Sequence, residues 1–94
     1  MSQQMQKKTP SQFPEVFADF MTLGERSRYG IGLSVPMGRD DLQPDLRELH
    51  EGQRVALVEW DNLWAEGTVH IVESGGHRYY YGVIARREDI RDIG

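Results

Sequence analysis

The first third of the chain carries apolar residues at helical spacing. Starting at Phe13, they fall at positions i, i+3, i+4, i+7 and i+8, which lie on one side of an α-helix. Pro14 suits the first turn of a helix because its missing N–H would have no partner there, and Gly24 supplies an end. The pattern therefore predicts a helix over residues 12–23. Its apolar stripe consists of Phe13, Val16, Phe17, Phe20 and Met21.

A weaker pattern follows in the next thirty residues. Residues 28–35 alternate loosely and contain Gly30 and Gly32, which favours a short strand or an extended arm that is ended by Pro36 and Gly38. Beyond this arm, three leucines at i, i+4 and i+7 stand just before a glycine and predict a second helix over residues 42–51. These leucines are Leu42, Leu46 and Leu49.

The second half of the chain changes to the two-residue period of β-strands. Three segments are rich in Val, Ile, Trp and Tyr, and they span residues 54–60, 63–73 and 77–85. The dipeptides between them, Asp61-Asn62 and Gly75-Gly76, tolerate the positive φ of tight hairpin turns, so the segments predict an antiparallel meander. Residues 86–93 then predict one helical turn and a short last strand, with Ile90 and Ile93 facing the interior.

Two-residue turns would fix which side chains share a face of this sheet. On that register one face is apolar and includes Val58, Val69 and Ile84, so we expect it to form the core. Gly67, in the middle of the longest strand, predicts a sharp bend. The opposite face mixes carboxylates and a histidine with large apolar groups, and it includes Leu57, Trp64, His70, Tyr79 and Tyr81.

Short motifs that combine glycine and valine recur along the meander. The strings are Gly52-Gln53-Arg54-Val55, Glu66-Gly67-Thr68-Val69 and Tyr80-Tyr81-Gly82-Val83, followed by Ile90 and Ile93. With this spacing, the segment from about residue 49 to residue 94 resembles SH3-like small barrels. The resemblance implies a fold and no particular function.

Together these segments predict a single α+β domain. We expect a strongly bent antiparallel sheet resembling an SH3-like barrel, preceded by two short helices and a disordered N-terminal tail. Residues 1–10 are polar and form the mobile tail, because they cannot bury enough apolar surface to offset ordering. Residues 11–94 form the domain, with a helical extension and arm over 11–52 and the SH3-like meander over 53–94.

Composition narrows the class of protein. The chain of 94 residues has no cysteine, so it lacks disulfides and thiolate metal sites, and we expect a cytoplasmic location. No apolar run approaches the roughly 18 to 20 residues of a membrane span, so we expect no membrane partner. The formal net charge of −4 and the small number of lysines weaken the case for nucleic-acid binding, which needs cations against phosphates.

Residues that could carry catalysis or bind a metal form no recognisable motif. The three histidines, His50, His70 and His77, lack the spacing of a metal site, so we expect no metal and no cofactor. The carboxylate pairs Asp40-Asp41 and Glu88-Asp89 are typical of helix N-termini, where they stabilise the positive end of the dipole. A non-enzymatic function is therefore favoured, although the residues leave an enzyme open.

Large aromatic residues beside carboxylates are the most informative group in the sequence. Tyrosine and tryptophan are enriched at interface hot spots. We therefore expect a non-enzymatic protein-interaction module that uses the aromatic and acidic face of a small barrel, or the edge from Trp60 to Asn62. Its partner is another protein or, in a homodimer, a second copy of the chain. The expected binding residues are Leu57, Trp60, Trp64, His70, Tyr79 and Tyr81.

Two alternatives stay open on the sequence. One is a nucleic-acid-binding module that stacks bases on tyrosines and holds phosphates with an edge formed by Arg54, Arg78, Arg86, Arg87 and Arg91. The other is small-molecule binding, or an oligomeric enzyme, with a pocket at an oligomer interface lined by His70 and Tyr81. The identity of the partner, the oligomeric state and the covering of the aromatic face do not follow from the sequence.

Overall fold

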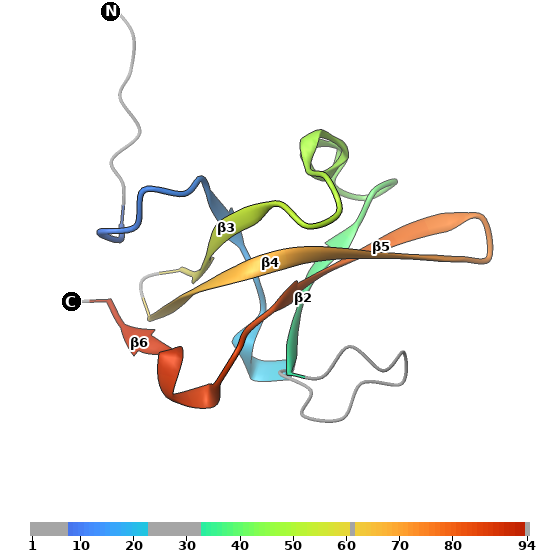
Figure 1. Cartoon of the computed structure of the whole chain (residues 1–94). Coiled ribbons are helices and arrows are strands. Elements are labelled where there is room, and N and C mark those ends of the chain that lie inside the picture. Colours follow the sequence, from blue (N-terminus) through green and yellow to red (C-terminus); the bar gives the residue numbers. More distant parts are fainter. Residues whose placement is uncertain (1–7, 23–32, 61, 94) are drawn as a thin grey trace, which may run out of the picture.

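The protein is built from short β-strands joined by turns (Figure 1). The computed structural model describes residues 8–22, 33–60 and 62–93, and this part of the chain contains no α-helix, hence none that could cross a membrane. The expectation of an α+β fold with two short helices is therefore wrong. In chain order, with η denoting a 3-10 turn, the elements are β1 (Glu15–Phe17), η1 (Phe20–Thr22), β2 (Ser34–Arg39), η2 (Pro44–Glu48), β3 (Arg54–Glu59), β4 (Leu63–Ser74), β5 (His77–Val83), η3 (Arg87–Asp89) and β6 (Arg91–Asp92).

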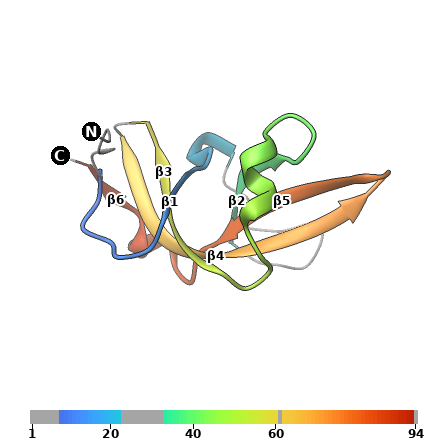
Figure 2. The same ribbon diagram turned by 90° about the horizontal axis from the view of Figure 1, so that it is seen from above.

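The strands form one mixed sheet that curls strongly (Figures 1 and 2). Its strand order is β1-β3-β4-β5-β2, and β6 pairs with the start of β4. β1 runs parallel to β3, whereas the other neighbouring strands are antiparallel. The curl brings the two ends of the order together, because the N–H of Asp19, just after β1, donates to the carbonyl of Pro36 in β2 at 2.9 Å. The shape is compatible with a small β-barrel.

Leu57 lies at the centre of the core with no exposed surface, against glycines of two neighbouring strands. A Cβ atom at Gly82 would lie 2.4 Å from the Leu57 side chain, and one at Gly67 would lie 2.9 Å from it. The two glycines therefore leave the space that this leucine fills at the bend of the sheet, where its burial stabilises the fold by roughly 1.5 to 3 kcal/mol. Other buried members of the core include Val35, Val55, Ala65, Val69, Tyr80 and Ile84.

The hairpin of β4 and β5 has the expected register. Ser74 pairs with His77, so the connection is the two-residue turn Gly75-Gly76, and both glycines have positive φ, 59° and 82°. Val69 and Ile84 face the core, as the pattern predicts. The glycine pair adopts this turn without steric cost, which is why the sequence specifies the register here.

The hairpin of β3 and β4 is offset by one residue from the expected register. Glu59 pairs with Leu63, so three residues connect the strands instead of two. Because side chains alternate along a strand, a shift of one residue turns every side chain of β3 to the other face. Leu57 consequently points into the core cluster, whereas Val58 lies on the opposite face, where it is also buried, with 6% of its surface exposed.

The apolar stripe that predicts a helix over residues 12–23 forms β1 and η1 instead. Val16 and Phe20 pack in or against the core, whereas Phe17 and Met21, from the same stripe, are 41% and 84% exposed. A helix of this length is marginal in isolation, and pairing of β1 with the distant β3 supplies backbone hydrogen bonds that local periodicity cannot reveal.

The second predicted helix, over residues 42–51, shrinks to η2. Leu46 is buried and Leu49 partly buried, but Leu42 remains 69% exposed. With only one leucine fully buried, this segment gains too little apolar burial to extend beyond a 3-10 turn.

β2 continues through the two residues that were expected to end the arm. Pro36 and Gly38 both lie within the strand, on either side of an irregularity in its pairing with β5. β2 is the last strand in the sheet order, and a proline is tolerated there because one edge needs no N–H donor. The part of the predicted arm over residues 28–32 lies outside the described residues.

The C-terminal prediction is confirmed for the turn, the short strand and Ile90, whereas Ile93 is not among the residues that pack against the core. The turn η3 is followed by the short strand β6, whose residues pair with Leu63 and Trp64 of β4. Ile90 packs against the core from between these elements.

Candidate functional site

A groove of about 750 Å³ lies between β1 and η2. Its deepest residues, Met37 and Leu46, belong to the core, and Val16 and Leu49 are partly buried beside them. The floor is therefore apolar. The lining residues are Pro14, Glu15, Val16, Phe17, Met37, Gln43, Pro44, Asp45, Leu46, Glu48, Leu49 and Gln53.

η2 is held across the groove by contacts at the end of β2. The N–H groups of Leu42 and Gln43 both donate to the carbonyl oxygen of Arg39, at 3.1 and 2.9 Å. Gly38, whose φ is 141°, leaves room for the Gln43 side chain, since a Cβ atom there would overlap its amide oxygen. Leu46 then inserts into the core and fixes the position of the turn.

Glu15, at the start of β1, binds the segment that precedes it. Its carboxylate accepts hydrogen bonds from the N–H groups of Lys8 and Thr9, at 3.0 and 2.8 Å, and from the Thr9 hydroxyl at 2.7 Å. Residues 8 and 9, which the sequence assigns to a mobile tail, are thus fastened to β1. Residues 1–7 of that tail lie outside the described residues.

All ionisable residues that line the groove are acidic. Besides Glu15, they are Asp45 and Glu48 of η2, both exposed. Within the described part of the chain, neither of these two carboxylates forms an ion pair. The groove therefore combines an apolar floor with uncompensated negative charge along one wall.

An exposed aromatic pair, Phe17 and Trp60, adjoins the groove through Phe17. The ring centroids are 5.1 Å apart with the planes tilted by 58°, and the two residues are 41% and 68% exposed. Trp60 has a φ of 50°, a left-handed conformation that costs a residue with a Cβ atom about 1 to 2 kcal/mol. Strain at an exposed tryptophan points to a role other than packing. The sequence indicates Trp60 but not Phe17, because exposure of Phe17 depends on the pairing of β1 with β3.

The other predicted binding residues do not gather in one place. Leu57 is buried in the core and cannot contact a partner at the surface. Trp64, His70, Tyr79 and Tyr81 are half-buried on the face of the sheet opposite to the core, which we call the outer face. Only His70 and Tyr81 are direct cross-strand neighbours.

His70 is part of a contact between β4 and the loop before β3. Its Nδ1 lies 2.9 Å from one oxygen of Glu51, whose other oxygen accepts a hydrogen bond from the N–H of Ile71 at 2.8 Å. The Ile71 N–H, and after it His70, lower the pKa of the Glu51 carboxyl below its ordinary value. The pair fastens this loop to the sheet.

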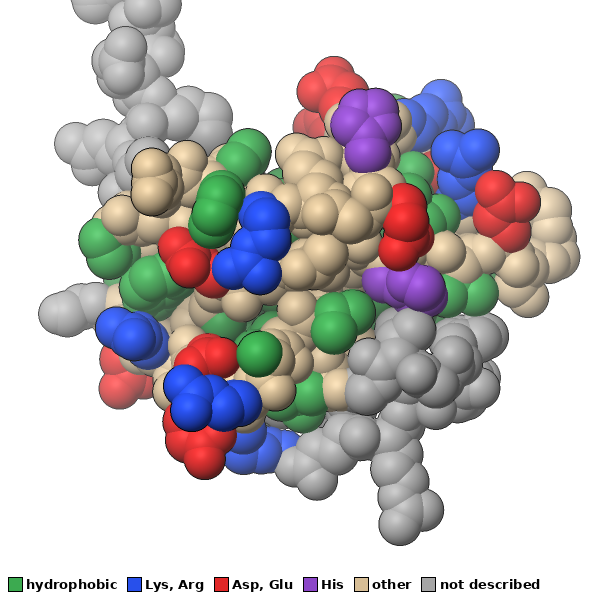
Figure 3. Space-filling model, in the orientation of Figure 1, with side chains coloured by type: hydrophobic (Ala, Val, Ile, Leu, Met, Phe, Trp, Pro, Cys, Tyr) green, Lys and Arg blue, Asp and Glu red, His purple; other side chains and the backbone are tan. Residues whose placement is uncertain are grey.

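The five predicted arginines do not form a basic edge. Arg54 pairs with Glu66, Arg78 with Glu73 near the β4–β5 turn, and Arg86 with Asp89 in η3. On the face shown in Figure 3, basic and acidic side chains alternate, so no area of single sign is available there for a phosphate backbone. Arg87 and Arg91 lie in η3 and β6.

Asp40, Asp41 and His77 come together where β2 approaches the β4–β5 turn, and their ligand atoms lie within 4.8 Å of one another. The guanidinium of Arg39 bonds both oxygens of Asp41 and lowers the pKa of that carboxyl. Because the arginine already occupies this carboxylate, the cluster is an ion-pair network that connects β2 to β5 and not a ready metal centre. The two aspartates therefore do not cap a helix.

Comparison of the chain with models of protein families, with curated proteins and with solved structures gives no match. Inferences about function must therefore come from the groove, the aromatic pair and the charges described above.

Proposed function

We propose that this protein is a protein-interaction module that binds an extended, basic and apolar segment of a partner protein in the groove between β1 and η2. The supporting observation is the apolar groove whose ionisable lining residues are all acidic, adjoining the exposed pair Phe17 and Trp60. Such an aromatic pair is typical of the residues that dominate binding energy at interfaces.

The edge of β1 supports an extended conformation for the bound segment. Pro14 accepts a hydrogen bond from the N–H of Ala56, and Ala18 donates to the carbonyl of Val58, so alternate residues of β1 face β3. By the same alternation, the backbone groups of Phe17 point away from β3. A segment laid along this edge can add backbone hydrogen bonds and place every second side chain on the apolar floor.

The charge of the groove selects the chemistry of the segment. Asp45 and Glu48 attract lysine or arginine side chains and disfavour acidic ones. Such charges raise the rate of association and exclude wrong partners more than they increase the binding affinity. The proposal keeps the SH3-like barrel suggested by the glycine and valine motifs, and it keeps a cytoplasmic location. Nucleic-acid binding has less support. The acidic groove repels phosphates, and arginines that are already paired with carboxylates do not attract them.

A peptide titration tests the proposal. Synthetic ten-residue peptides that alternate lysine with valine or leucine should bind in a calorimeter, whereas peptides with glutamate in place of lysine should not. Asp45→Asn together with Glu48→Gln should weaken binding several-fold, and Trp60→Ala should weaken it at least tenfold, since hot-spot truncations cost about 2 kcal/mol or more.

The controls are residues of the same kinds outside the groove. Leu42→Ala removes an exposed apolar side chain, and Glu88→Gln removes an exposed carboxylate of η3, so neither should change the affinity. Equal binding of the basic and acidic peptides would overturn the proposal. A dimer in solution that Trp60→Ala dissociates would instead identify a second copy of the chain as the occupant.

A further inference from the structure

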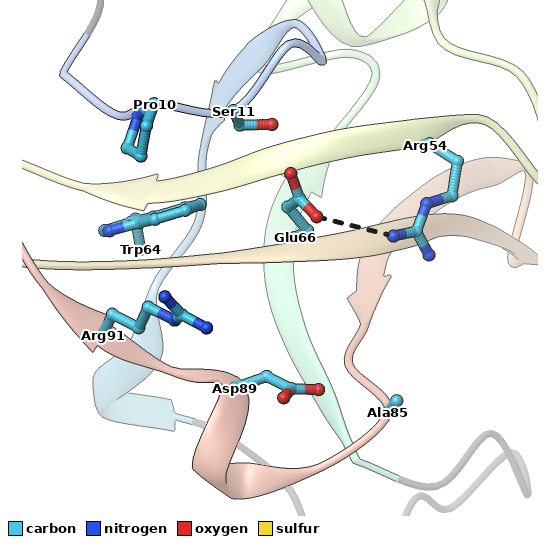
Figure 4. Close-up of a pocket in the computed structure, with 8 residues that line it drawn as sticks. All are labelled: Pro10, Ser11, Arg54, Trp64, Glu66, Ala85, Asp89 and Arg91. Carbon is cyan, nitrogen blue, oxygen red and sulfur yellow. Dashed lines mark ion pairs between the residues drawn. The ribbon is translucent and has the colours of Figure 1, made fainter.

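A second pocket, of about 380 Å³, opens on the outer face of the sheet (Figure 4) and has no lining residue in common with the groove. Three separate parts of the chain line it. Pro10 comes from the segment that Glu15 fastens, Arg54, Trp64 and Glu66 come from β3 and β4, and Asp89 and Arg91 come from η3 and β6. A pocket of this size can enclose a small organic molecule.

Charges of opposite sign alternate around the pocket. Figure 4 shows Arg91, Glu66, Arg54 and Asp89 in turn around an open centre, so the lining carries two positive and two negative groups. Trp64 forms one wall, with Pro10 on one side of it and Arg91 on the other. Trp64 and Arg91 are direct cross-strand neighbours.

These charged groups satisfy one another incompletely. The closest approach between Arg54 and Glu66 is 3.9 Å, too long for a hydrogen bond. Asp89 is bonded by Arg86, which does not line the pocket, at 3.2 Å. Within the described residues, the guanidinium of Arg91 makes no ion pair. Hydrogen-bonding capacity for both signs is therefore left over inside the pocket.

A neutral lining with both signs selects a ligand with both signs. A simple anion is attracted by the arginines but repelled by the carboxylates at similar range. A simple cation is attracted by the carboxylates but repelled by the arginines. A molecule with separated ammonium and carboxylate groups gains from both, and the indole face of Trp64 suits an apolar or cationic part. We propose that this pocket binds a small zwitterion of the amino acid or dipeptide class, independently of the peptide groove.

Four related probes, in two pairs of matched size, test the charge requirement. Free phenylalanine and the dipeptide glycyl-phenylalanine carry both charges, N-acetyl-phenylalanine carries only the carboxylate, and phenylalanine amide carries only the ammonium. The two indole N–H signals in an NMR spectrum of the full chain, assigned with a Trp60→Phe variant, report each tryptophan separately. The zwitterions should shift the Trp64 signal and leave the Trp60 signal unchanged, with an affinity at least threefold above that of either singly charged probe.

Two variants assign the charges. Arg91→Gln should weaken binding of the zwitterion, which loses the partner of its carboxylate. Phenylalanine amide should bind this variant at least as tightly as the unmodified protein, because its ammonium no longer meets repulsion from Arg91. Asp89→Asn should reduce the affinity for the zwitterion to the affinity for N-acetyl-phenylalanine. Arg78→Gln, at the far end of the β4–β5 hairpin, is the matched control and should change nothing. Each folded variant should still bind one of the singly charged probes, whereas an unfolded variant would bind none. Loss of folding is therefore distinguishable from loss of a charge contact.

The test also distinguishes amino acids from dipeptides. If only the dipeptide shifts the Trp64 signal, the pocket requires the longer separation between the ammonium and carboxylate groups. If only free phenylalanine shifts it, the pocket requires the shorter separation. No shift of Trp64 at 10 mM of any probe, a concentration about tenfold above a Kd of 1 mM, would overturn the proposal, as would equal binding of all four probes. Peptide binding in the groove would shift Trp60 instead, so failure of either proposal leaves the other untouched.

Discussion

The two hairpins that share β4 have similar strands but different turns. In the β4–β5 hairpin, the positive φ angles fall on Gly75 and Gly76, which adopt them freely. In the β3–β4 hairpin, a positive φ falls on Trp60, where it is strained. The residues within the first turn determine its conformation. The conformation of the second turn is determined instead by which side chains the flanking strands bury.

This difference shows where the register of β3 comes from. With a two-residue turn, Leu57 would lie on the outer face and Val58 in the core. The three-residue connection places Leu57 against Gly67 and Gly82 instead, in the space that the missing side chains of these glycines leave. Burial of this leucine offsets the strain at Trp60, because it stabilises the fold by roughly 1.5 to 3 kcal/mol against a cost of about 1 to 2 kcal/mol.

The largest test of this comparison is Leu57→Ala. We expect a loss of about 2 to 5 kcal/mol in the free energy of unfolding, because the side chain is fully buried and leaves a cavity. Urea unfolding followed by circular dichroism measures it. Val58→Ala, on the other face of the same strand, should cost clearly less. The reverse order would show that β3 has the two-residue register.

A double-mutant cycle between the strands sharpens the same point. Gly82→Ala should cost about 1 to 3 kcal/mol, because the new methyl group would lie 2.4 Å from Leu57. In a Leu57→Ala background most of this cost should disappear, which gives a coupling energy above 1 kcal/mol. Gly67→Ala is the control, since its methyl group also meets the backbone oxygen of Val83 at 2.8 Å and stays costly in both backgrounds. Additive costs at Gly82 would contradict the packing described here.

The fold is predictable from the sequence wherever one segment contains its own signal. The strands β3, β4 and β5, the Gly75-Gly76 turn and the final turn and strand follow from alternation and turn residues. β1 does not, because Val16 and Phe17, two members of an apolar stripe at helical spacing, form a strand only by pairing with β3. A local pattern cannot report a partner that lies far away in the chain.

Substitutions in the two turns should have different effects on stability. Gly76→Ala should destabilise by about 1 to 2 kcal/mol, because alanine has a Cβ atom and the φ there is 82°. Trp60→Gly should change stability by less than about 1 kcal/mol, since relief of strain balances loss of the contact with Phe17, worth about 0.5 to 1.5 kcal/mol. Thermal melts of both variants test this. A large loss of stability in Trp60→Gly would show that the tryptophan serves packing.

The smallest expected effect concerns Glu51, which fastens the loop before β3 to β4. Its pKa in the folded protein is lowered, so its contribution to stability is present above the ordinary value of 4.5 and is lost as the pH falls through the folded value. Glu51→Gln should therefore cost about 0.5 kcal/mol or less at pH 7, because the site is exposed, and the cost should be smaller at pH 3. Urea midpoints of the unmodified protein and the variant at both pH values test this.

The candidate site is less predictable than the fold. Trp60 was identifiable as a large aromatic residue at a turn, but its neighbour Phe17 was hidden in an apolar stripe. Asp45 and Glu48 matter only because η2 carries them to the wall of the groove. Each of these placements depends on tertiary packing, so the residue types alone could not indicate them.

The strained backbone at position 60 has a practical consequence for engineering. Glycine and asparagine adopt a left-handed conformation more easily than tryptophan does. A library selected for heat resistance alone would therefore accept such replacements at this position and discard the indole ring. Only a second selection, for capture of a ligand, would keep it.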